Sequence, residues 1–242
     1  MTRVCLFTDT LGDVNGVSRF IRNVADQALA RGIELHAITS TRFECPAQAN
    51  IHNPRPPFAR PMPRYPQLEI VVPPTRQLHD LADRLKPDVV HISTPGPVGV
   101  AGRRWARKRG VPLIGTYHTD FPAYIEHLFD DPVFTWTCTQ TMRWFYRPFS
   151  RIFTRSADYG AALERMGLAS DRIVRLLPGI DTDTFHTRYH DAGGGVWAAC
   201  PGVRPSSVKV LYVGRVSVEK NLPMLTRIWP RVHAACRQRG RD

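Results

Sequence analysis

The segment 210–222, VLYVGRVSVEKNL, carries the residue types whose spacing most clearly suggests chemistry. Its first four residues predict a buried strand, Gly214 predicts a turn, and the final Asn-Leu pair predicts the start of a helix. Arg215 and Lys220 flank this turn. Because backbone N–H groups at a helix N-terminus favour phosphate, two cations beside them would bind a diphosphate from two sides. The pattern therefore predicts an anion site.

A second candidate site follows the apolar run 113–117, where the sequence continues HTDFP from His118. The run predicts a strand, and open α/β sheets bind ligands at the carboxyl ends of their strands. A neutral His118 imidazole there would hydrogen-bond a sugar hydroxyl or reach the reacting atoms. A lone histidine also serves as a structural residue with satisfied hydrogen bonds. The residues alone leave both interpretations open.

A glycine loop with Gly12 and Gly16 follows the first apolar run, residues 4–8. Its glycines would let a ligand approach the backbone near the start of the next predicted helix. A tight turn between strand and helix requires glycine in any case, so a purely structural loop is the alternative. The chain has no GxGxxG, GK[ST] or GxSxG motif, which argues against P-loop hydrolysis and against a Ser-His-Asp hydrolase.

The sequence offers little for a metal ion. It has no HExxH motif, and its D-x-D letters, Asp181 to Asp183, lie in a turn rather than after a strand. The five cysteines are scattered singly, which fits a reducing compartment. We therefore expect no metal and no other cofactor. Without a signal-like N-terminus or an apolar run of about 18 residues, the chain is predicted to be cytoplasmic.

Apolar runs typical of strands alternate with segments of helical periodicity along most of the chain. The run at 4–8, the helical pattern up to Gly32 and the run at 34–39 predict a right-handed βαβ crossover. The alternation predicts an α/β fold with a doubly wound parallel sheet. Further predicted strands lie at 68–72, 89–92, 113–117, 152–156 and 173–177, and further helices at 76–85, 99–109, 134–149 and 159–166.

Eight prolines between residues 54 and 74 predict that this segment is a loop, because proline lacks an N–H donor and breaks helices. The loop would be either a stiff connection or an acceptor-side element that uses its arginines. The aromatic helix predicted at 134–149 would belong either to the core or to a membrane-facing surface.

The chain is strongly basic, with a formal net charge of +12 and a pI of about 10.1. Such a charge favours an anionic partner, although arginines spread along a chain also occur on an ordinary solvated surface. The cluster RRWARKR at 103–109 is predicted on the outer face of a helix, where it would contact anionic lipid headgroups. An anionic membrane surface is therefore a candidate partner.

Five motifs occur in order along the chain: FTDT with NGVSR near the N-terminus, HISTPGP at 91–97, HTDFP at 118–122, PGIDTDTF at 178–185, and GR with EKN at 214–221. Together they resemble the retaining nucleotide-sugar glycosyltransferases of family 4, in particular those that transfer mannose or glucose to glycolipids. The resemblance implies a GT-B fold, in which two Rossmann-like domains bind the acceptor and the donor. It implies hexose transfer from a nucleotide diphosphate sugar to a lipid or saccharide acceptor, without a metal, a cofactor or nucleic acid.

The resemblance also implies roles for individual residues. His118 would contact the transferred sugar as the catalytic residue, and Gly16 would approach the phosphate or the acceptor. Arg215 and Lys220 would neutralise the leaving diphosphate, a role that cations are expected to take in a metal-free site. On the acceptor side we expect Asn15, Thr119 and Asp120.

We predict an acceptor-side domain over 1–187, a linker over 188–207 and the first strand and helix of an incomplete donor domain over 208–242. The chain lacks the pair of glutamates that hold the donor in the family, so we expect a truncated enzyme without detectable sugar transfer of its own. The alternative is a non-enzymatic basic α/β module that binds an anionic membrane surface, peripherally at the inner membrane.

Overall fold

The computed structural model describes residues 2–62, 65–177, 179, 181–189, 197, 200–201, 204, 207–214, 216 and 220–239. The chain divides into two units, Met1–Gly179 and Ile180–Asp242, and each is described by itself. The domain boundary near residue 187 and the linker over 188–207 stay predictions. Most of the linker lies outside the described residues.

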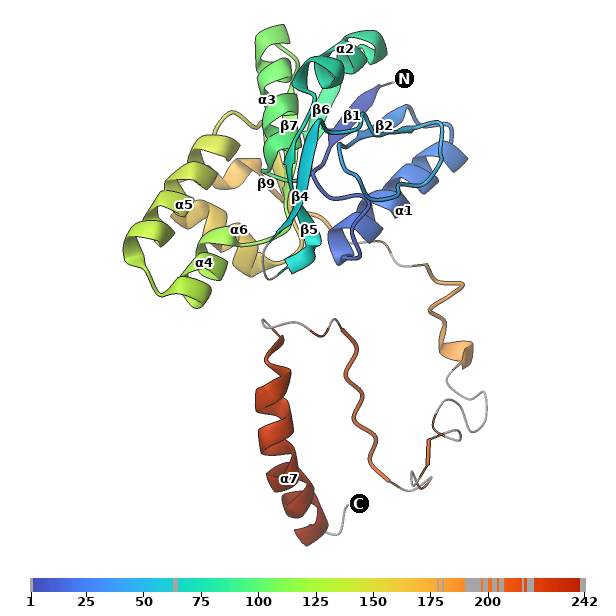
Figure 1. Ribbon diagram of the computed structural model, residues 1–242, viewed down its shortest axis with the longest axis vertical. Coiled ribbons are helices and arrows are strands. Elements are labelled where there is room, and N and C mark those ends of the chain that lie inside the picture. Colours follow the sequence, from blue (N-terminus) through green and yellow to red (C-terminus); the bar gives the residue numbers. More distant parts are fainter. Residues whose placement is uncertain are drawn as a thin grey trace. The chain divides into compact units, whose positions relative to one another are not determined.

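A seven-stranded sheet forms the centre of the first unit, and all its strand pairs are parallel (Figure 1). The strand order is β3-β2-β1-β6-β7-β8-β9. This order reverses between β1 and β6, which makes their carboxyl ends the topological switch point of the sheet. The predicted doubly wound α/β fold is confirmed. The strands are β1 (Val4–Phe7), β2 (Leu35–Ile38), β3 (Ile51–His52), β6 (Val89–Ile92), β7 (Leu113–Tyr117), β8 (Arg151–Thr154) and β9 (Ile173–Arg175).

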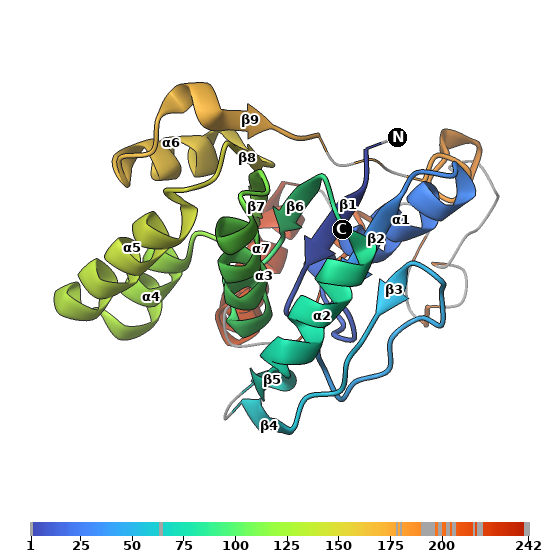
Figure 2. The ribbon, with the colours of Figure 1, turned by 90° about the horizontal axis from the view of Figure 1, so that it is seen from above.

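Helices cover both sides of the sheet, because alternate residues of each strand point to opposite faces. Leu6 packs with Ile21 of α1, whereas its neighbours Cys5 and Phe7 pack with side chains of α2 and α3. Figure 2 shows α1 and α2 on opposite sides of β1 and β2. The helices of this unit are α1 (Gly16–Ala30), α2 (Thr75–Leu85), α3 (Pro97–Arg109), α4 (Phe121–Phe129), α5 (Pro132–Tyr146) and α6 (Ala157–Arg165).

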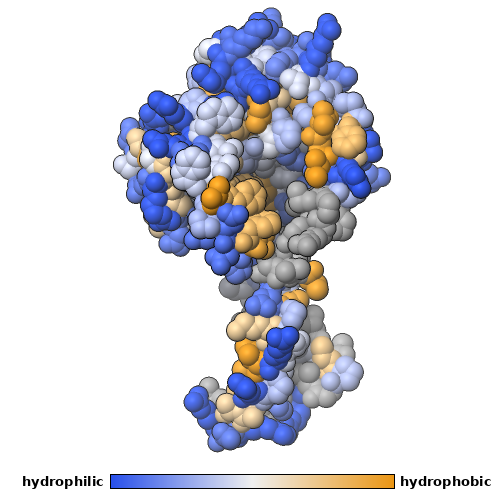
Figure 3. Space-filling view, turned by 60° about the vertical axis from the view of Figure 1, so that its left-hand side comes forward, coloured by the Kyte–Doolittle hydropathy of each residue, from blue (hydrophilic) through white to orange (hydrophobic). Residues whose placement is uncertain are grey.

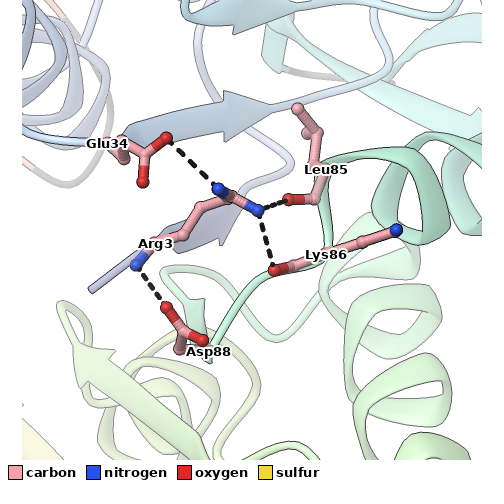
Figure 4. A network of polar contacts seen from close by, with 5 residues as sticks. All are labelled: Arg3, Glu34, Leu85, Lys86 and Asp88. Carbon is pink, nitrogen blue, oxygen red and sulfur yellow. Dashed lines mark hydrogen bonds and ion pairs between the residues drawn. The ribbon is translucent and has the colours of Figure 1, made fainter. Parts of the chain in front are cut away.

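Arg3 holds the amino ends of the strands together (Figure 4). Its guanidinium donates to the carbonyl oxygens of Leu85, at 2.8 Å, and Lys86, at 3.3 Å, which close the C-terminus of α2. The same group pairs with Glu34 at 3.3 Å, and the Arg3 backbone N–H donates to Asp88 at 2.7 Å. A cation at a helix C-terminus is favourable, because the last carbonyl groups carry partial negative charge. These contacts of Arg3 lie at the amino edge of the sheet, away from the loops that follow the carboxyl ends of the strands.

The prediction of a loop over 54–74 is wrong, whereas the strand predicted at 68–72 is confirmed as part of a longer strand. Residues 58–62 and 65–72 form an antiparallel pair, β4 (Phe58–Met62) and β5 (Tyr65–Val72). A sheet of two strands leaves each strand an open edge, where a residue without an N–H group breaks no ladder. Pro61 also lies at the register shift between Pro61 and Met62. This hairpin therefore tolerates its prolines, which a central strand of a sheet would not.

The basic cluster at 103–109 forms an outer face only in part. Its cations Arg104, Arg107, Lys108 and Arg109 are exposed, as predicted, whereas Arg103 is not. Arg103 is buried and donates to the carbonyl oxygens of Trp144 and Phe145, both at 3.0 Å, at the end of α5. Trp105 is buried, and Arg109 pairs with Asp83 at 2.6 Å. Two of the five cations are therefore engaged within the fold. Arg104, Arg107 and Lys108 lie exposed on α3, and the membrane contact there stays a prediction.

The aromatic helix α5 contributes to the core and to the surface. Met142, Phe145 and Tyr146 are buried, whereas Trp136 and Trp144 are exposed. In Figure 3, hydrophilic side chains cover much of the face in view, with small apolar patches among them. Within the described part of the chain, no helix is both long and apolar enough to cross a bilayer.

The second unit contains the predicted helix, α7 (Leu222–Gln238), but the predicted buried strand at 210–213 is not formed. Val210, Leu211 and Val213 are 64%, 67% and 82% exposed. A strand needs a neighbouring strand to pair its backbone N–H and C=O groups. The described residues of this unit supply none, so the segment stays irregular.

Candidate functional site

Four polar residues occupy equivalent places at the carboxyl edge of the sheet. Each is the first residue after a parallel strand: Thr8 after β1, Ser93 after β6, His118 after β7 and Arg155 after β8. The register of the sheet and the alternation of side chains place them on the side that α1 covers. They therefore gather beside the switch point, where open α/β sheets bind ligands.

Asp9 joins the loops that follow β1 and β6. Its carboxylate accepts hydrogen bonds from the Thr94 hydroxyl at 2.6 Å and from the backbone N–H groups of Val98, at 2.7 Å, and Gly99, at 3.3 Å. It thereby caps the N-terminus of α3, where a negative charge is favoured. Burial raises the pKa of this carboxyl, and the hydrogen bonds from Thr94, Val98 and Gly99 oppose the rise. The contact fixes the two loops of the switch point against each other.

The predicted residues Asn15 and Gly16 begin α1. The Asn15 side chain accepts from the Ser18 N–H at 2.8 Å and donates to the Thr10 hydroxyl at 2.8 Å. It therefore acts as the N-cap of the helix, a role that the sequence analysis did not assign to it. A Cβ added at Gly16 would meet no atom within 4 Å, so packing does not explain this glycine. The space around it is compatible with the predicted approach of a ligand.

His118 is held at one ring nitrogen and free at the other. Its Nε2 lies 3.0 Å from the hydroxyl of Ser93, and its ring contacts Phe20 edge-on at 5.7 Å between centroids. Its Nδ1 is buried and has no hydrogen-bond partner among the described residues. Burial, reinforced by the charge of Arg155 and by His91, lowers the pKa of His118 to about 3. The imidazole is therefore neutral near pH 7, with one nitrogen available to a ligand.

The low histidine pKa values predict a pH-dependent stability. His91, whose Nε2 lies 2.8 Å from the Thr116 hydroxyl, has its pKa lowered to about 4 by burial. The unfolded chain binds these protons near the ordinary value of about 6.5, whereas the folded protein does not, so stability present at pH 7 is lost below that value. We expect the free energy of unfolding, from urea titrations, to fall more steeply between about pH 7 and about pH 5 in the wild type than in His91→Gln. Parallel curves would contradict a neutral His91.

Arg155 is the site residue that the sequence analysis missed. Its guanidinium carbon lies 4.7 Å from the centroid of Phe20, and its Nε is buried without a hydrogen-bond partner. The strand predicted at 152–156 included Arg155, so its place at the end of a strand was not predicted. In the structure β8 ends at Thr154, and Arg155 follows it as His118 follows β7. Polar residues directly after parallel strands reach the same edge of the sheet, whatever their separation in the sequence.

Thr119 and Asp120 lie at the start of α4, which the sequence analysis did not predict. Asp120 accepts from the Tyr117 hydroxyl at 3.0 Å and from the Ala123 N–H at 3.3 Å, and it is the N-cap of α4. The backbone oxygen of Thr119 accepts from the Phe121 N–H at 3.0 Å. Asp120 therefore has a structural role in the loop that carries His118. Its acceptor-side role stays a prediction.

The predicted diphosphate residues belong to the second unit. Arg215 lies outside the described residues, and Lys220 is exposed two residues before α7. Because the two units are not placed relative to each other, the structure brings neither cation together with His118. In the described part of the chain, no three His, Cys, Asp or Glu side chains form a group that could hold a metal ion.

The first unit thus defines an open α/β domain with ligand-binding geometry at its switch point. The family model of Glycosyltransferase Family 4 matches residues 14–184, and the chain belongs to this family. The matched region begins in the loop after β1 and includes Ser93, His118 and Arg155.

The curated relatives that match the chain are also glycosyltransferases. The chain is 28% identical over 231 residues to the GDP-mannose-dependent alpha-mannosyltransferase of Mycobacterium tuberculosis, covering 93% of this chain and 58% of the relative. It is 26% identical over 179 residues to the sulfoquinovosyl transferase SQD2 of Arabidopsis thaliana, covering 72% of this chain and 34% of the relative. The chain therefore spans about a third to three fifths of the length of these relatives.

Solved structures share the fold. Anabaena HepE in complex with UDP and glucose matches with a TM-score of 0.53 at 14% identity, covering 76% of this chain and 46% of that one. Sucrose-phosphate synthase from Thermosynechococcus elongatus matches with a TM-score of 0.51 at 12% identity, covering 76% of this chain and 49% of that one. These likenesses agree with the predicted N-terminal domain of a GT-B fold.

Proposed function

We propose that this chain supplies the acceptor-side half of a hexosyltransferase, which moves a hexose from a nucleotide diphosphate sugar to a lipid or saccharide acceptor. The observation that carries the proposal is the buried, unpartnered Nδ1 of His118 at the switch point of the sheet. Family membership and the mannosyl- and sulfoquinovosyltransferases among the relatives support it. Mannose and glucose are the proposed sugars, and retention of the anomeric configuration is part of the proposal.

His118 has the properties that such a transfer requires of it. Ser93 orients the ring through Nε2, which leaves Nδ1 to hydrogen-bond a hydroxyl of the transferred sugar. When the bond between the anomeric carbon and the phosphate breaks, negative charge develops on the leaving diphosphate. Arg215 and Lys220 are proposed to stabilise that charge, as the cations of a metal-free site would.

A fused protein tests the proposal. Residues 1–185 would be joined to the C-terminal part of the Mycobacterium tuberculosis alpha-mannosyltransferase, beginning after its corresponding turn. With GDP-mannose and diacylglycerol or glucuronosyl-diacylglycerol as acceptors, we expect mannosylated glycolipid. His118→Ala in the fused protein should lower turnover by about tenfold or more, because a buried hydrogen bond to the reacting sugar is lost.

His127→Ala is the matched control, since His127 is an exposed histidine of α4 and should leave turnover unchanged. GDP affinity, measured by calorimetry, reports whether the donor half is functional. A folded fused protein that binds GDP but transfers no mannose would overturn the proposed function. Equal turnover of the His118→Ala and His127→Ala proteins would remove His118 from its role.

A further inference from the structure

Arg155 lies at the carboxyl edge of the sheet beside His118. It follows the last residue of β8 and precedes Ser156, the N-cap of α6. Phe20 of α1 contacts both side chains, because its ring lies 4.7 Å from the Arg155 guanidinium carbon and 5.7 Å from the His118 ring. The two residues therefore form one cluster around Phe20.

The cluster contains two unused hydrogen-bonding atoms. Arg155 Nε and His118 Nδ1 are both buried, and neither has a partner among the described residues. A buried polar atom without a partner destabilises a fold, and native proteins contain few of them. Two such atoms in one cluster at a switch point indicate groups kept for a ligand.

The cluster is also positively charged. The two ion pairs formed within the described part of the chain involve Arg3 and Arg109, so no carboxylate there neutralises Arg155. The N-terminus of α6, whose N-cap Ser156 follows Arg155, adds partial positive charge. A guanidinium without a carboxylate partner, beside a helix N-terminus, presents a planar pair of donors that suits an oxyanion.

We propose that Arg155 binds an anionic oxygen group, a phosphate or a carboxylate, of a substrate that occupies the site beside His118. This inference deepens the proposed function, because it states the charge of a substrate. It can be tested by binding alone, so its failure is distinct from a failure of sugar transfer. The guanidinium would hold the oxyanion through Nε and a terminal nitrogen while Phe20 supports its face.

The direct test observes the Arg155 Nε–H group by NMR. The chain would be labelled with 15N-arginine, and the Nε signal assigned by its loss in Arg155→Lys. Inorganic phosphate, methyl phosphate and glucuronate are the probes. We expect saturable shifts of this signal in the wild type. Affinities of the wild type and the variants would be compared through the backbone amide signals, and Arg155→Gln should bind about tenfold more weakly or worse, the loss typical of a charge-assisted hydrogen bond. The oxyanion affinity of Arg155→Lys should lie between those of the wild type and Arg155→Gln, because lysine keeps the charge but lacks the planar pair of donors.

Arg151→Gln is the matched control. Arg151 begins the same strand, β8, at its opposite end, and its exposed guanidinium donates to the Ser150 carbonyl. The substitution removes the same charge, so its oxyanion affinity should match the wild type. An equal loss in both variants would reduce the effect to net charge and overturn the proposal. Absence of any shift of the Nε signal in the folded wild type would overturn it as well, whether or not Arg155→Gln folds.

Further titrations separate the two sources of an oxyanion. If GDP or UDP shifts the Nε signal and competes with phosphate, the group belongs to the donor diphosphate. If glucuronate or glycerol phosphate shifts it while the nucleotides do not, the group belongs to an acidic acceptor. Either result supports an oxyanion site at Arg155. Sugar transfer by the fused protein without any of these shifts would leave the proposed function intact and refute the anion site.

Discussion

Asp9→Ala is expected to lower the free energy of unfolding by about 3 kcal/mol, because hydrogen bonds to a charged group contribute about 1.5–3 kcal/mol each. The Asp9 carboxylate accepts from the Thr94 hydroxyl at 2.6 Å and from the Val98 N–H at 2.7 Å. Alanine would leave both donors without their partner and would remove the cap of α3. The loops after β1 and β6 would then lose their mutual support, so the switch point should become more mobile. Urea titration followed by circular dichroism measures the loss.

Asp171→Ala is the control for this prediction. Asp171 is exposed in a short 3-10 turn, Ser170–Arg172, and surface substitutions of this kind usually change stability by less than about 0.5 kcal/mol. If Asp9→Ala were as stable as Asp171→Ala, the carboxylate would not be holding the two loops together.

Gly99→Ala is expected to destabilise the protein by about 3 kcal/mol or more, at the upper end of the range for overpacking. A Cβ at this position would lie 1.9 Å from the carbonyl oxygen of Thr94 and 3.0 Å from a methyl carbon of Ile92. The nearest obstacle is backbone, which cannot rotate away as a flexible side chain would. Relief of the clash requires a shift of the α3 N-terminus, which would also break the Asp9 cap. Thermal and urea unfolding would measure the effect.

Gly160→Ala makes the same chemical change in α6, where the nearest atom to an added Cβ is an Ile173 methyl carbon at 3.6 Å. Alanine is a better helix former than glycine by about 1 kcal/mol, so this variant should be unchanged or more stable. A wild-type stability for Gly99→Ala would show that α3 can move away from the Thr94 carbonyl at little cost.

Local patterns predicted much of the fold. Apolar runs with helical segments between them predicted the strands β1, β2, β6, β7, β8 and β9 and most of the helices, because burial on a parallel sheet leaves a periodic trace in the chain. They did not predict α4, whose N-cap Asp120 lies within the motif of His118. They predicted residues 68–72 of β5 but missed β4 and the start of β5, because a two-stranded sheet tolerates prolines at its open edges.

Of the residues at the candidate site, some could be predicted from the sequence and others could not. The type of residue and its place after a strand were sufficient to select His118, because the carboxyl edge of a parallel sheet is where ligands bind. Arg155 has an equivalent place but no recognisable motif around it, so its connection with His118 depends on strand order and on Phe20 of α1. The burial of Arg103 and the bonds of Asp9 to α3 likewise join residues distant in the sequence.

By itself, the sequence determined the class of fold, the family motifs and the edge of the sheet that carries the site, because strand and helix periodicity and loop composition are local properties of the chain. Only the tertiary structure decided which charges are used within the fold and which remain available to a ligand. Arg103 is committed to the carbonyl groups of α5, whereas Arg155 keeps a buried Nε without a partner. The physical reason is that a charged group's role depends on the partners and the solvent around it, and packing between distant segments sets both.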